Sequence, residues 1–401
     1  MRTLISFAAL LLSVAFVQLG SGSLGPLDAL AGTARGFSPS EIGLLGSAHF
    51  IGFFIGCWAT PRLMGSIGHS RAFAALAAVG AIAALMHPVI DSPVAWAVLR
   101  IGTGMAVAGA YTVVESWLQA KVDNANRGRV LGVYRLVDLG ASVAAQGVVA
   151  LLDPASYVAY NLIAALCCLC LLPLTLTTSK PPSIPASPRL APLKLFRVSP
   201  LAGVAVMVTG VTNAGFRMAG PIYALESGLN ATQVALFMIA GVSGGALAQW
   251  PAGWLSDKFD RRRVLIGLSV AAIGVSILSA YAGAAYWVAF FFGFATFPMF
   301  SIAAAHANDF GDGEQAVEIS AALMFVYGVG AIASPLVAST LIESYGPAAL
   351  FVFVAGAHIL LILFSVWRMT RRALSGAKTP HRYVPRTTFT IAHLFKSRRD
   401  E

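Results

Sequence analysis

Two charged side chains lie three residues apart in an otherwise apolar stretch of this chain. Arg135 and Asp138 fall within residues 129–152, which we predict to form one helix. Residues three apart share a helix face, so the two side chains can form an ion pair. One interpretation is a pair that simply neutralises itself. The other is a functional site in which Asp138 takes up a proton while Arg135 holds an anion.

A third charge in an apolar stretch is Arg217, and its predicted helix at 200–224 contains no acidic residue. Gly215 and Gly220 leave room beside it. A forked guanidinium suits carboxylate, phosphate or sulfonate groups. We therefore predict that Arg217 binds either an anionic cargo or an acidic side chain from another helix.

Four further titratable residues fall near one end of predicted helices, and they are Glu115, His306, Asp309 and Glu318. Their placement predicts a gate at that end rather than a central binding site. Histidine titrates near neutral pH, although His306 can equally be a hydrogen-bonded packing residue. Three other histidines are each isolated in the sequence and receive no role, and they are His49, His87 and His358.

The residues do not support other kinds of chemistry. The four cysteines lie in apolar runs at spacings that match no common metal motif, which predicts buried thiols. We find no Walker-type motif for ATP and no nucleophile–base set. We therefore expect that the protein binds no cofactor or metal and is not an enzyme. The net charge of +10 comes from short loops and the C-terminal end, which favours membrane orientation over nucleic-acid binding.

Membrane-spanning helices must position these residues. Only 11% of the 401 residues are charged, against roughly 25% in soluble domains. Long apolar stretches recur along the chain, each near the length of about 20 residues that crosses a bilayer. Their continuity favours helices over barrel strands. We predict twelve transmembrane helices, at 3–25, 38–60, 71–90, 93–118, 129–152, 155–177, 200–224, 231–256, 262–283, 285–308, 317–342 and 346–370.

The basic residues predict how the chain is oriented. If the N-terminus is cytoplasmic, Arg35 is the basic residue of the outer loops, and Arg100, Arg135 and Arg217 lie within helices. All other Lys and Arg residues then lie on the cytoplasmic side, as the positive-inside rule requires. We predict that both termini are cytoplasmic and that the first helix is retained rather than cleaved as a signal peptide.

The chain consists of two similar halves. A shift of 192 residues aligns Ser38 and Glu41 with Asn230 and Gln233, and both pairs have the spacing of a helix capping box. We predict an N-terminal six-helix bundle at 1–178, a Pro- and Ser-rich cytoplasmic linker at 179–199, a C-terminal six-helix bundle at 200–372 and a disordered basic tail at 373–401. Paired six-helix repeats are typical of transporters.

One loop carries a specific motif. Residues 253–263 read GWLSDKFDRRR and resemble the cytoplasmic motif of the major facilitator superfamily, in which a Gly stands where this chain has Asp260. The corresponding loop of the first half is degenerate, although it keeps Gly68 and Arg71. The motif implies that Asp257, Lys258, Arg261, Arg262 and Arg71 act as a cytoplasmic gate that clamps the two bundles by ion pairs.

Further stretches at 114–116, 126–129, 245–251 and 305–309 resemble the bacterial YcaD-like branch of that superfamily. The resemblance spans residues 3 to 370. It implies an all-α membrane protein of two six-helix bundles in a pseudo-twofold arrangement, monomeric and located in the inner membrane. Arg100 and Gly104 are similar to a second family motif, which implies a role for Arg100 in proton coupling. By the same analogy Arg100 faces the first helix, where Gln18 could meet it.

Together these features predict a secondary active transporter that moves a small organic solute by alternating access. Asp138 and Glu115 can titrate, which favours protons as the coupling ion. Three intramembrane arginines against these two acids favour an anionic or zwitterionic cargo. The helix at 129–152 lacks the Gly-Pro motif of drug antiporters, which favours uptake. The alternatives are a proton-coupled exporter of amphipathic compounds and a non-transporting receptor or assembly factor.

Overall fold

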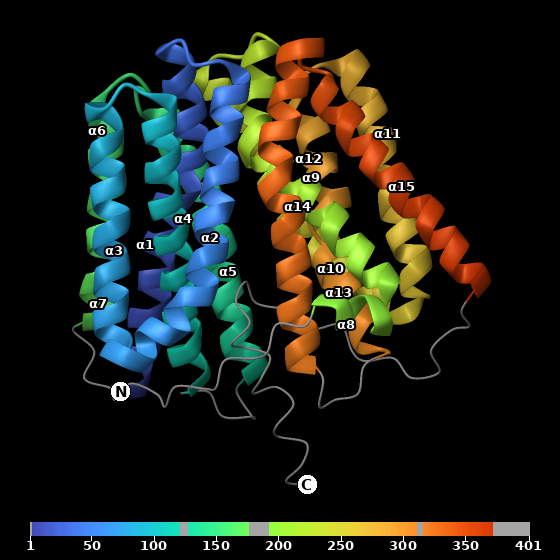
Figure 1. The fold of residues 1–401 in the computed structure, drawn as a ribbon, viewed down its shortest axis with the longest axis horizontal. Coiled ribbons are helices and arrows are strands. Elements are labelled where there is room, and N and C mark those ends of the chain that lie inside the picture. The colour runs from blue at the N-terminus through green and yellow to red at the C-terminus, as the bar shows by residue number, and fades with distance from the viewer. Residues whose placement is uncertain (1, 121–126, 176–191, 311–315, 372–401) are drawn as a thin grey trace, which may run out of the picture. The chain divides into compact units, whose positions relative to one another are not determined.

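The computed structural model describes residues 2–120, 127–175, 192–310 and 316–371, which are helical almost throughout and include no strand (Figure 1). Contacts between helices divide the chain into two compact units, residues 1–187 (unit 1) and 188–401 (unit 2). The predicted tail at 373–401 and most of the predicted linker at 179–199 lie outside the described residues, so the predicted domain limits stay predictions.

Unit 1 contains the first half of the predicted helices. Its elements are α1 (Arg2–Ala34), α2 (Pro39–Ile67), α3 (His69–Met86), the short 3-10 helix η1 (His87–Val89), α4 (Pro93–Ala120), α5 (Arg127–Leu151), α6 (Tyr157–Leu169) and α7 (Leu171–Thr175). The first helix is longer than the predicted 3–25, because the chain continues as a helix through Pro26 to Ala34. Asp28 therefore lies in a helix rather than in a loop.

Unit 2 contains the second half. Its elements are α8 (Pro192–Val198), α9 (Pro200–Glu226), α10 (Ala231–Lys258), α11 (Arg261–Ala282), α12 (Tyr286–Thr296), α13 (Met299–Asn308), α14 (Ala316–Tyr345) and α15 (Ala349–Arg371). Pro298 stands between α12 and α13, which together occupy the predicted helix at 285–308. The short helix α8 packs against α9 and α14 and buries Leu195 completely.

Eleven helical segments of the described chain are long and apolar enough to cross a membrane. The remaining predicted span, α5, is a helix of 25 residues. It is less apolar because it carries Arg135 and Asp138 together with the arginines of its first turn. The helical membrane architecture predicted from composition is thus confirmed.

The two capping boxes predicted from sequence are formed. The Ser38 hydroxyl accepts a hydrogen bond from the Glu41 N–H at 3.3 Å, and the Glu41 carboxylate accepts one from the Ser38 N–H at 2.8 Å. Asn230 and Gln233 make the same reciprocal pair at 3.0 and 2.9 Å. These bonds satisfy first-turn N–H groups that have no acceptor within the helix.

The helix contacts repeat between the units. In unit 1, α2 packs on α4, α1 on α5 and α3 on α6; in unit 2, α10 packs on α12, α9 on α14 and α11 on α15. Gly52 of α2 and Gly244 of α10 are equivalent under the 192-residue shift. A Cβ on Gly52 would collide with the backbone carbonyl of Ile101, and one on Gly244 with that of Phe290. Close approach of backbones at small residues is typical of membrane helix pairs.

Candidate functional site

A cluster of four polar side chains lies in the interior of unit 1. Asp28 comes from α1, His87 from η1, Arg100 from α4 and Tyr160 from α6. Each is at most 2% exposed. Charged side chains in membrane helices are costly and are therefore rare, paired and functional by default.

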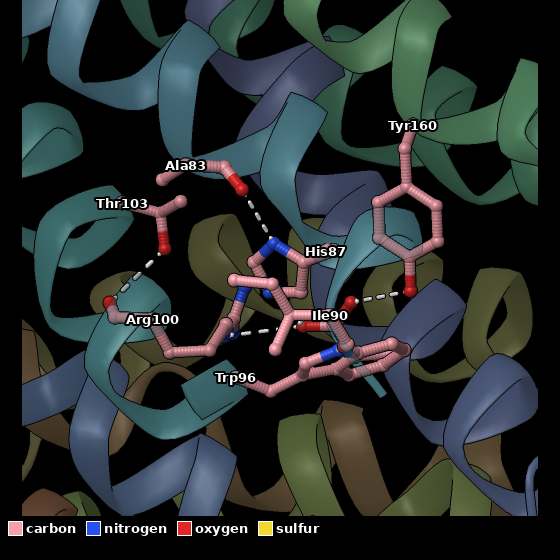
Figure 2. A network of polar contacts seen from close by, with 8 residues as sticks. Ala83, His87, Ile90, Trp96, Arg100, Thr103 and Tyr160 are labelled. Atoms are coloured by element: carbon pink, nitrogen blue, oxygen red, sulfur yellow. Dashed lines mark hydrogen bonds and ion pairs between the residues drawn. The ribbon is translucent and has the colours of Figure 1, made fainter. Parts of the chain in front are cut away.

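Asp28 is the centre of this cluster. Its Oδ1 accepts a hydrogen bond from the Tyr160 hydroxyl at 2.9 Å. Its Oδ2 lies 3.4 Å from Nε of Arg100 and 3.7 Å from Nε2 of His87. The imidazole stacks on the Tyr160 ring, with centroids 5.3 Å apart, and the edge of Trp96 packs against it (Figure 2).

The surroundings of His87 indicate that its Nε2 can accept one more proton. Its Nδ1 lies 2.7 Å from the carbonyl oxygen of Ala83, which can only accept, so Nδ1 carries a hydrogen (Figure 2). In neutral imidazole the other nitrogen, Nε2, then presents a lone pair to the Asp28 carboxylate. A proton shared between Nε2 and Oδ2 of Asp28 would replace this repulsion with a hydrogen bond.

The structure corrects three predictions about these residues. The predicted first helix ends at residue 25 and so leaves out Asp28, which is a buried acid within α1. His87 was assigned no role and is part of the cluster. Arg100 faces the first helix as expected, but its ion-pair partner there is Asp28, ten residues beyond Gln18. The signal that could have found Asp28 is the apolar stretch after Pro26, which continues to Ala34.

A second polar cluster of unit 1 joins α1, α4 and α5. Arg135 and Asp138 form the ion pair that their spacing predicted, with Nη1 and Oδ2 2.6 Å apart. The Tyr111 hydroxyl is 2.8 Å from Oδ1 of Asp138 and also contacts Oε1 of Gln18. Asp138 is 1% exposed and Gln18 also 1%. Gln18 precedes Asp28 by ten residues on α1, which separates the two clusters by about 15 Å.

Tyr111 cannot donate to both oxygens, because a hydroxyl carries one hydrogen. If Asp138 is ionised, Tyr111 donates to Asp138, and the Gln18 amide must turn its NH2 group toward Tyr111. If Asp138 is protonated, it donates a hydrogen bond to the Tyr111 oxygen, and the Tyr111 hydroxyl donates its own hydrogen bond to Gln18 Oε1. The orientation of the Gln18 amide on α1 thus depends on the protonation of Asp138 on α5.

Glu115 lies toward the end of α4 and is 2% exposed. It accepts a hydrogen bond of 2.8 Å from the Tyr134 hydroxyl of α5. Glu115 is also predicted to pair with an arginine of the nearby cytoplasmic loops, and this stays a prediction, because the side chains of Arg127 and Arg129 lie outside the described residues.

In unit 2, the cytoplasmic motif forms two groups of ion pairs. Nε of Arg261 lies 3.2 Å from Oδ2 of Asp309, and Nη2 of Arg261 lies 3.8 Å from Oδ1 of Asp257. Arg262 pairs with Asp260 at 3.0 Å. Asp260, the residue that departs from the family motif, is also the N-cap of α11 and accepts from the Arg262 backbone N–H at 3.0 Å.

Asp260 lies between α10 and α11, and two effects oppose each other at its carboxyl. Burial raises the pKa of Asp260, but hydrogen bonds from the side chain and backbone of Arg262 lower it more. The net result is a lowered pKa, so Asp260 is ionised at neutral pH. Arg262 therefore has a permanent counter-charge at the start of α11.

The other predicted residues are spread over both units. Lys258 lies over the Trp254 ring at 4.9 Å, and Arg217 lies over the Phe297 ring at 5.6 Å. His306 is buried and packs edge-on against Phe310. Arg71 is exposed on α3.

Glu318 falls in α14, but its side chain is outside the described residues. His358, which received no role, lies between the hydroxyls of Thr212 and Ser269 at 3.2 Å from each, so it is a hydrogen-bonded core residue. Within the described ranges, no three His, Cys, Asp or Glu side chains converge as metal ligands would.

Sequence comparison finds relatives over most of the chain. The model of the Major Facilitator Superfamily matches residues 10–333, with a second, overlapping match at 204–399. The chain is 27% identical over 327 residues to an uncharacterized MFS-type transporter of Yersinia pestis (strain Pestoides F), covering 80% of this chain and 85% of that protein. It is 27% identical over 331 residues to the uncharacterized MFS-type transporter YcaD of Salmonella newport (strain SL254), with the same coverage.

Solved structures are similar over most of the chain. The nucleoside transporter NupG matches with a TM-score of 0.76 at 17% identity, covering 93% of this chain and 100% of that one. A D-xylose-proton symporter matches with a TM-score of 0.67 at 16% identity, covering 94% and 98%. At these identities the likeness shows a shared fold.

Proposed function

The chain belongs to the major facilitator superfamily and is a multi-pass secondary transporter, and from this premise we propose that protons drive it through the Asp28–His87–Arg100 cluster. The cargo is a small organic solute that crosses the bacterial inner membrane by alternating access. The observation that carries the proposal is the geometry at Asp28, whose Oδ2 faces both Arg100 and the Nε2 of His87.

The cluster suits proton uptake because it offers a counter-charge for the ionised acid and a second acceptor for the proton. Its net charge rises from zero to +1 when the proton binds. Ionised Asp28 is balanced by Arg100, and an added proton is held between Asp28 and His87. Without Arg100, an ionised carboxylate at this depth would be expensive. Protonation weakens the attraction between Asp28 and Arg100, which belong to different helices, so it can favour one arrangement of α1 and α4 over another.

The Gln18–Tyr111–Asp138–Arg135 chain supplies a second titratable position. Its hydrogen bonds reverse direction when Asp138 gains a proton, and this links α1 to α5. We propose that Asp138 takes up a proton or responds to bound cargo during transport. When neither is present, the ion pair with Arg135 keeps the Asp138 carboxylate ionised. A pair with a purely structural role is the alternative.

The charges of the cytoplasmic motif support a gate at the end of the bundles. Arg261 lies between Asp257 and Asp309 within unit 2, and Glu115 and Arg71 belong to unit 1. We propose that these residues, with Lys258, Arg262, His306 and Glu318, stabilise one state of the transport cycle. Cytoplasmic termini and a monomeric state are part of the same proposal.

The charge count gives weaker support for an anionic cargo than the sequence suggested, because Asp28 is a third intramembrane acid and pairs with Arg100. The preference for an anion or zwitterion now rests on the geometry of Arg217. Its guanidinium carbon lies 5.6 Å from the centroid of the Phe297 ring, and a planar, forked guanidinium suits a carboxylate or phosphate. Uptake stays the proposed direction, and export of amphipathic compounds is the alternative.

The first experiment is a thermal-shift screen of the purified protein with anionic, neutral and cationic metabolites. A ligand at 100 times its dissociation constant stabilises the folded state by about 2.7 kcal/mol. We expect carboxylates or phosphates to give the shift and Arg217→Gln to abolish it while the protein stays folded. A shift given only by cationic or neutral amphiphiles would contradict the anion proposal and favour export.

The ligand found in this way then tests proton coupling. Proteoliposomes with a pH-sensitive dye inside should acidify when the ligand is added outside, and Asp28→Asn or Asp138→Asn should abolish the acidification. Asp91→Asn is the matched control, because Asp91 pairs with Arg35 at the surface, where its side chain is 74% exposed. Acidification that persists in Asp28→Asn would show that the coupling site lies elsewhere.

A further inference from the structure

A pocket in unit 2 brings three basic side chains together with the start of a long helix. Ser199, Pro200 and Leu201 form one wall at the start of α9, and Arg262, His306 and Arg368 contribute the basic side chains, together with Phe310. They come from α9, α11, α13 and α15. We propose that this pocket binds a phosphate group, and that its occupant is the headgroup of an anionic membrane lipid.

The start of α9 contributes backbone donors. Ser199 is the N-cap of this helix of 27 residues, and its hydroxyl accepts from the Ala202 N–H at 3.4 Å. Pro200 at the first helical position has no N–H, so Leu201 is the first residue whose amide can donate. The Leu201 amide and the positive end of the helix dipole favour a phosphate at this place.

The charge of the pocket comes mainly from Arg368. Arg262 is neutralised by Asp260 at 3.0 Å, and Arg261 by Asp309 and Asp257. Arg368 is half-buried near the end of α15, and its contact is the Trp367 ring at 5.7 Å. Within residues 192–310 and 316–371, no carboxylate lies within ion-pair distance of it. Because this positive charge is half-buried, binding of an anion would stabilise it. The guanidinium can bind a phosphate through two parallel hydrogen bonds.

The surface beside Arg368 favours a lipid over a soluble anion. The preceding turn of α15 exposes Leu363, Val366 and Trp367 by 61, 51 and 50%. These side chains offer an apolar track for an acyl chain, and Trp is enriched where membrane meets water. Basic pockets between transmembrane helices bind the headgroups of anionic lipids in other membrane proteins. The inference is independent of the cargo and of the proposed proton site.

The test is lipid retention by the full-length protein. We would reconstitute it in nanodiscs of phosphatidylethanolamine and phosphatidylglycerol, release it and count bound phosphatidylglycerol by native mass spectrometry. We expect Arg368→Gln to lower retention by about tenfold, the effect of losing one charge-assisted contact. Arg263→Gln is the matched control, since Arg263 is the exposed neighbour of Arg262 and does not line the pocket.

Thermal unfolding in detergent separates the two sources of phosphate. Phosphatidylglycerol should raise the unfolding temperature of the parent protein and of Arg263→Gln, but not that of Arg368→Gln. A shift with inorganic phosphate alone that disappears in Arg368→Gln would support the site with a soluble phosphate as occupant. If Arg368→Gln cannot be purified, Arg368→Lys should show a partial loss. Equal retention and equal shifts in the parent, Arg368 and Arg263 proteins would overturn the proposal.

Discussion

The two units use the same helix contacts around different interiors. Under the 192-residue shift, Asp28 corresponds to Gly220 and Arg100 to Phe292. Where unit 1 has its buried ion pair, unit 2 has an aromatic cluster. Phe292 stacks on Phe216 with centroids 4.7 Å apart and meets the edge of Phe351 at 5.4 Å.

This difference shows which part of the repeat is structural. The glycine contacts of α2 with α4 and of α10 with α12 occur in both units, so they belong to the scaffold. The buried ion pair of unit 1, Asp28 with Arg100, has no counterpart in unit 2, where the equivalent residues are Gly220 and Phe292. An ion pair costs more to bury than aromatic rings do, so we infer that unit 1 retains it for function.

The comparison is most sharply tested by placing the same residue at the two equivalent positions. Arg100→Leu leaves the Asp28 carboxylate buried without its guanidinium, and we expect a loss of about 3–5 kcal/mol in the free energy of unfolding. Phe292→Leu should cost less than about 1.5 kcal/mol, because volume and polarity change little. Urea titration of the detergent-purified proteins measures both.

A double variant identifies the cause of that loss. Asp28→Leu combined with Arg100→Leu removes both charges and should recover most of the stability. It should still lack ligand-driven proton uptake. If the double variant is as unstable as Arg100→Leu alone, packing rather than charge accounts for the loss.

The shared scaffold predicts equal effects of a second matched pair. Gly52→Ala and Gly244→Ala each introduce a methyl group against a backbone carbonyl, and we expect each to cost about 1–3 kcal/mol. Gly267→Ala is the control, since a Cβ there meets nothing within 4 Å. It should be neutral or stabilising by up to about 1 kcal/mol. A large loss in only one of the two close-packed variants would show that the units differ in packing as well as in charge.

The loops after α2 and α10 differ at Gly68 and Asp260. Because the folded pKa of Asp260 is lowered from 3.8, its charge stabilises the fold above that pH, and the contribution is lost as the pH falls through the lowered value. Asp260→Asn keeps the helix cap but removes the charge. It should cost about 1 kcal/mol at pH 7 and nothing once the wild-type carboxyl is protonated. Unfolding midpoints from pH 7 to 3 give the comparison, and a constant difference would rule out the charge as its source.

The smallest expected effect concerns the capping boxes. Ser38→Ala and Asn230→Ala each remove the capping hydrogen bond at an equivalent helix start, and each should cost about 0.5–1 kcal/mol. Thermal unfolding followed by tryptophan fluorescence can compare them. Unequal losses would show that the two caps, although alike in geometry, stabilise their helices to different extents.

Much of the candidate site was accessible from local patterns. The pair Arg135–Asp138 follows from a spacing of three on one helix, and the two capping boxes follow from similarly short spacings. The ion pairs of Arg261 with Asp257 and of Arg262 with Asp260 likewise lie within one motif. In each case the partners are so close in sequence that the helix itself brings them together.

The sequence by itself determined the membrane class, the helical repeat, the capping boxes and the family, because these depend on composition, periodicity and short motifs. Only the tertiary structure decided the partners of Asp28, since His87, Arg100 and Tyr160 reach it from three other elements. Which side chains meet between helices depends on how each helix is rotated and where it crosses its neighbours. A one-dimensional pattern does not contain that information. For this reason the sequence did not predict that Asp28 lies at the centre of the site.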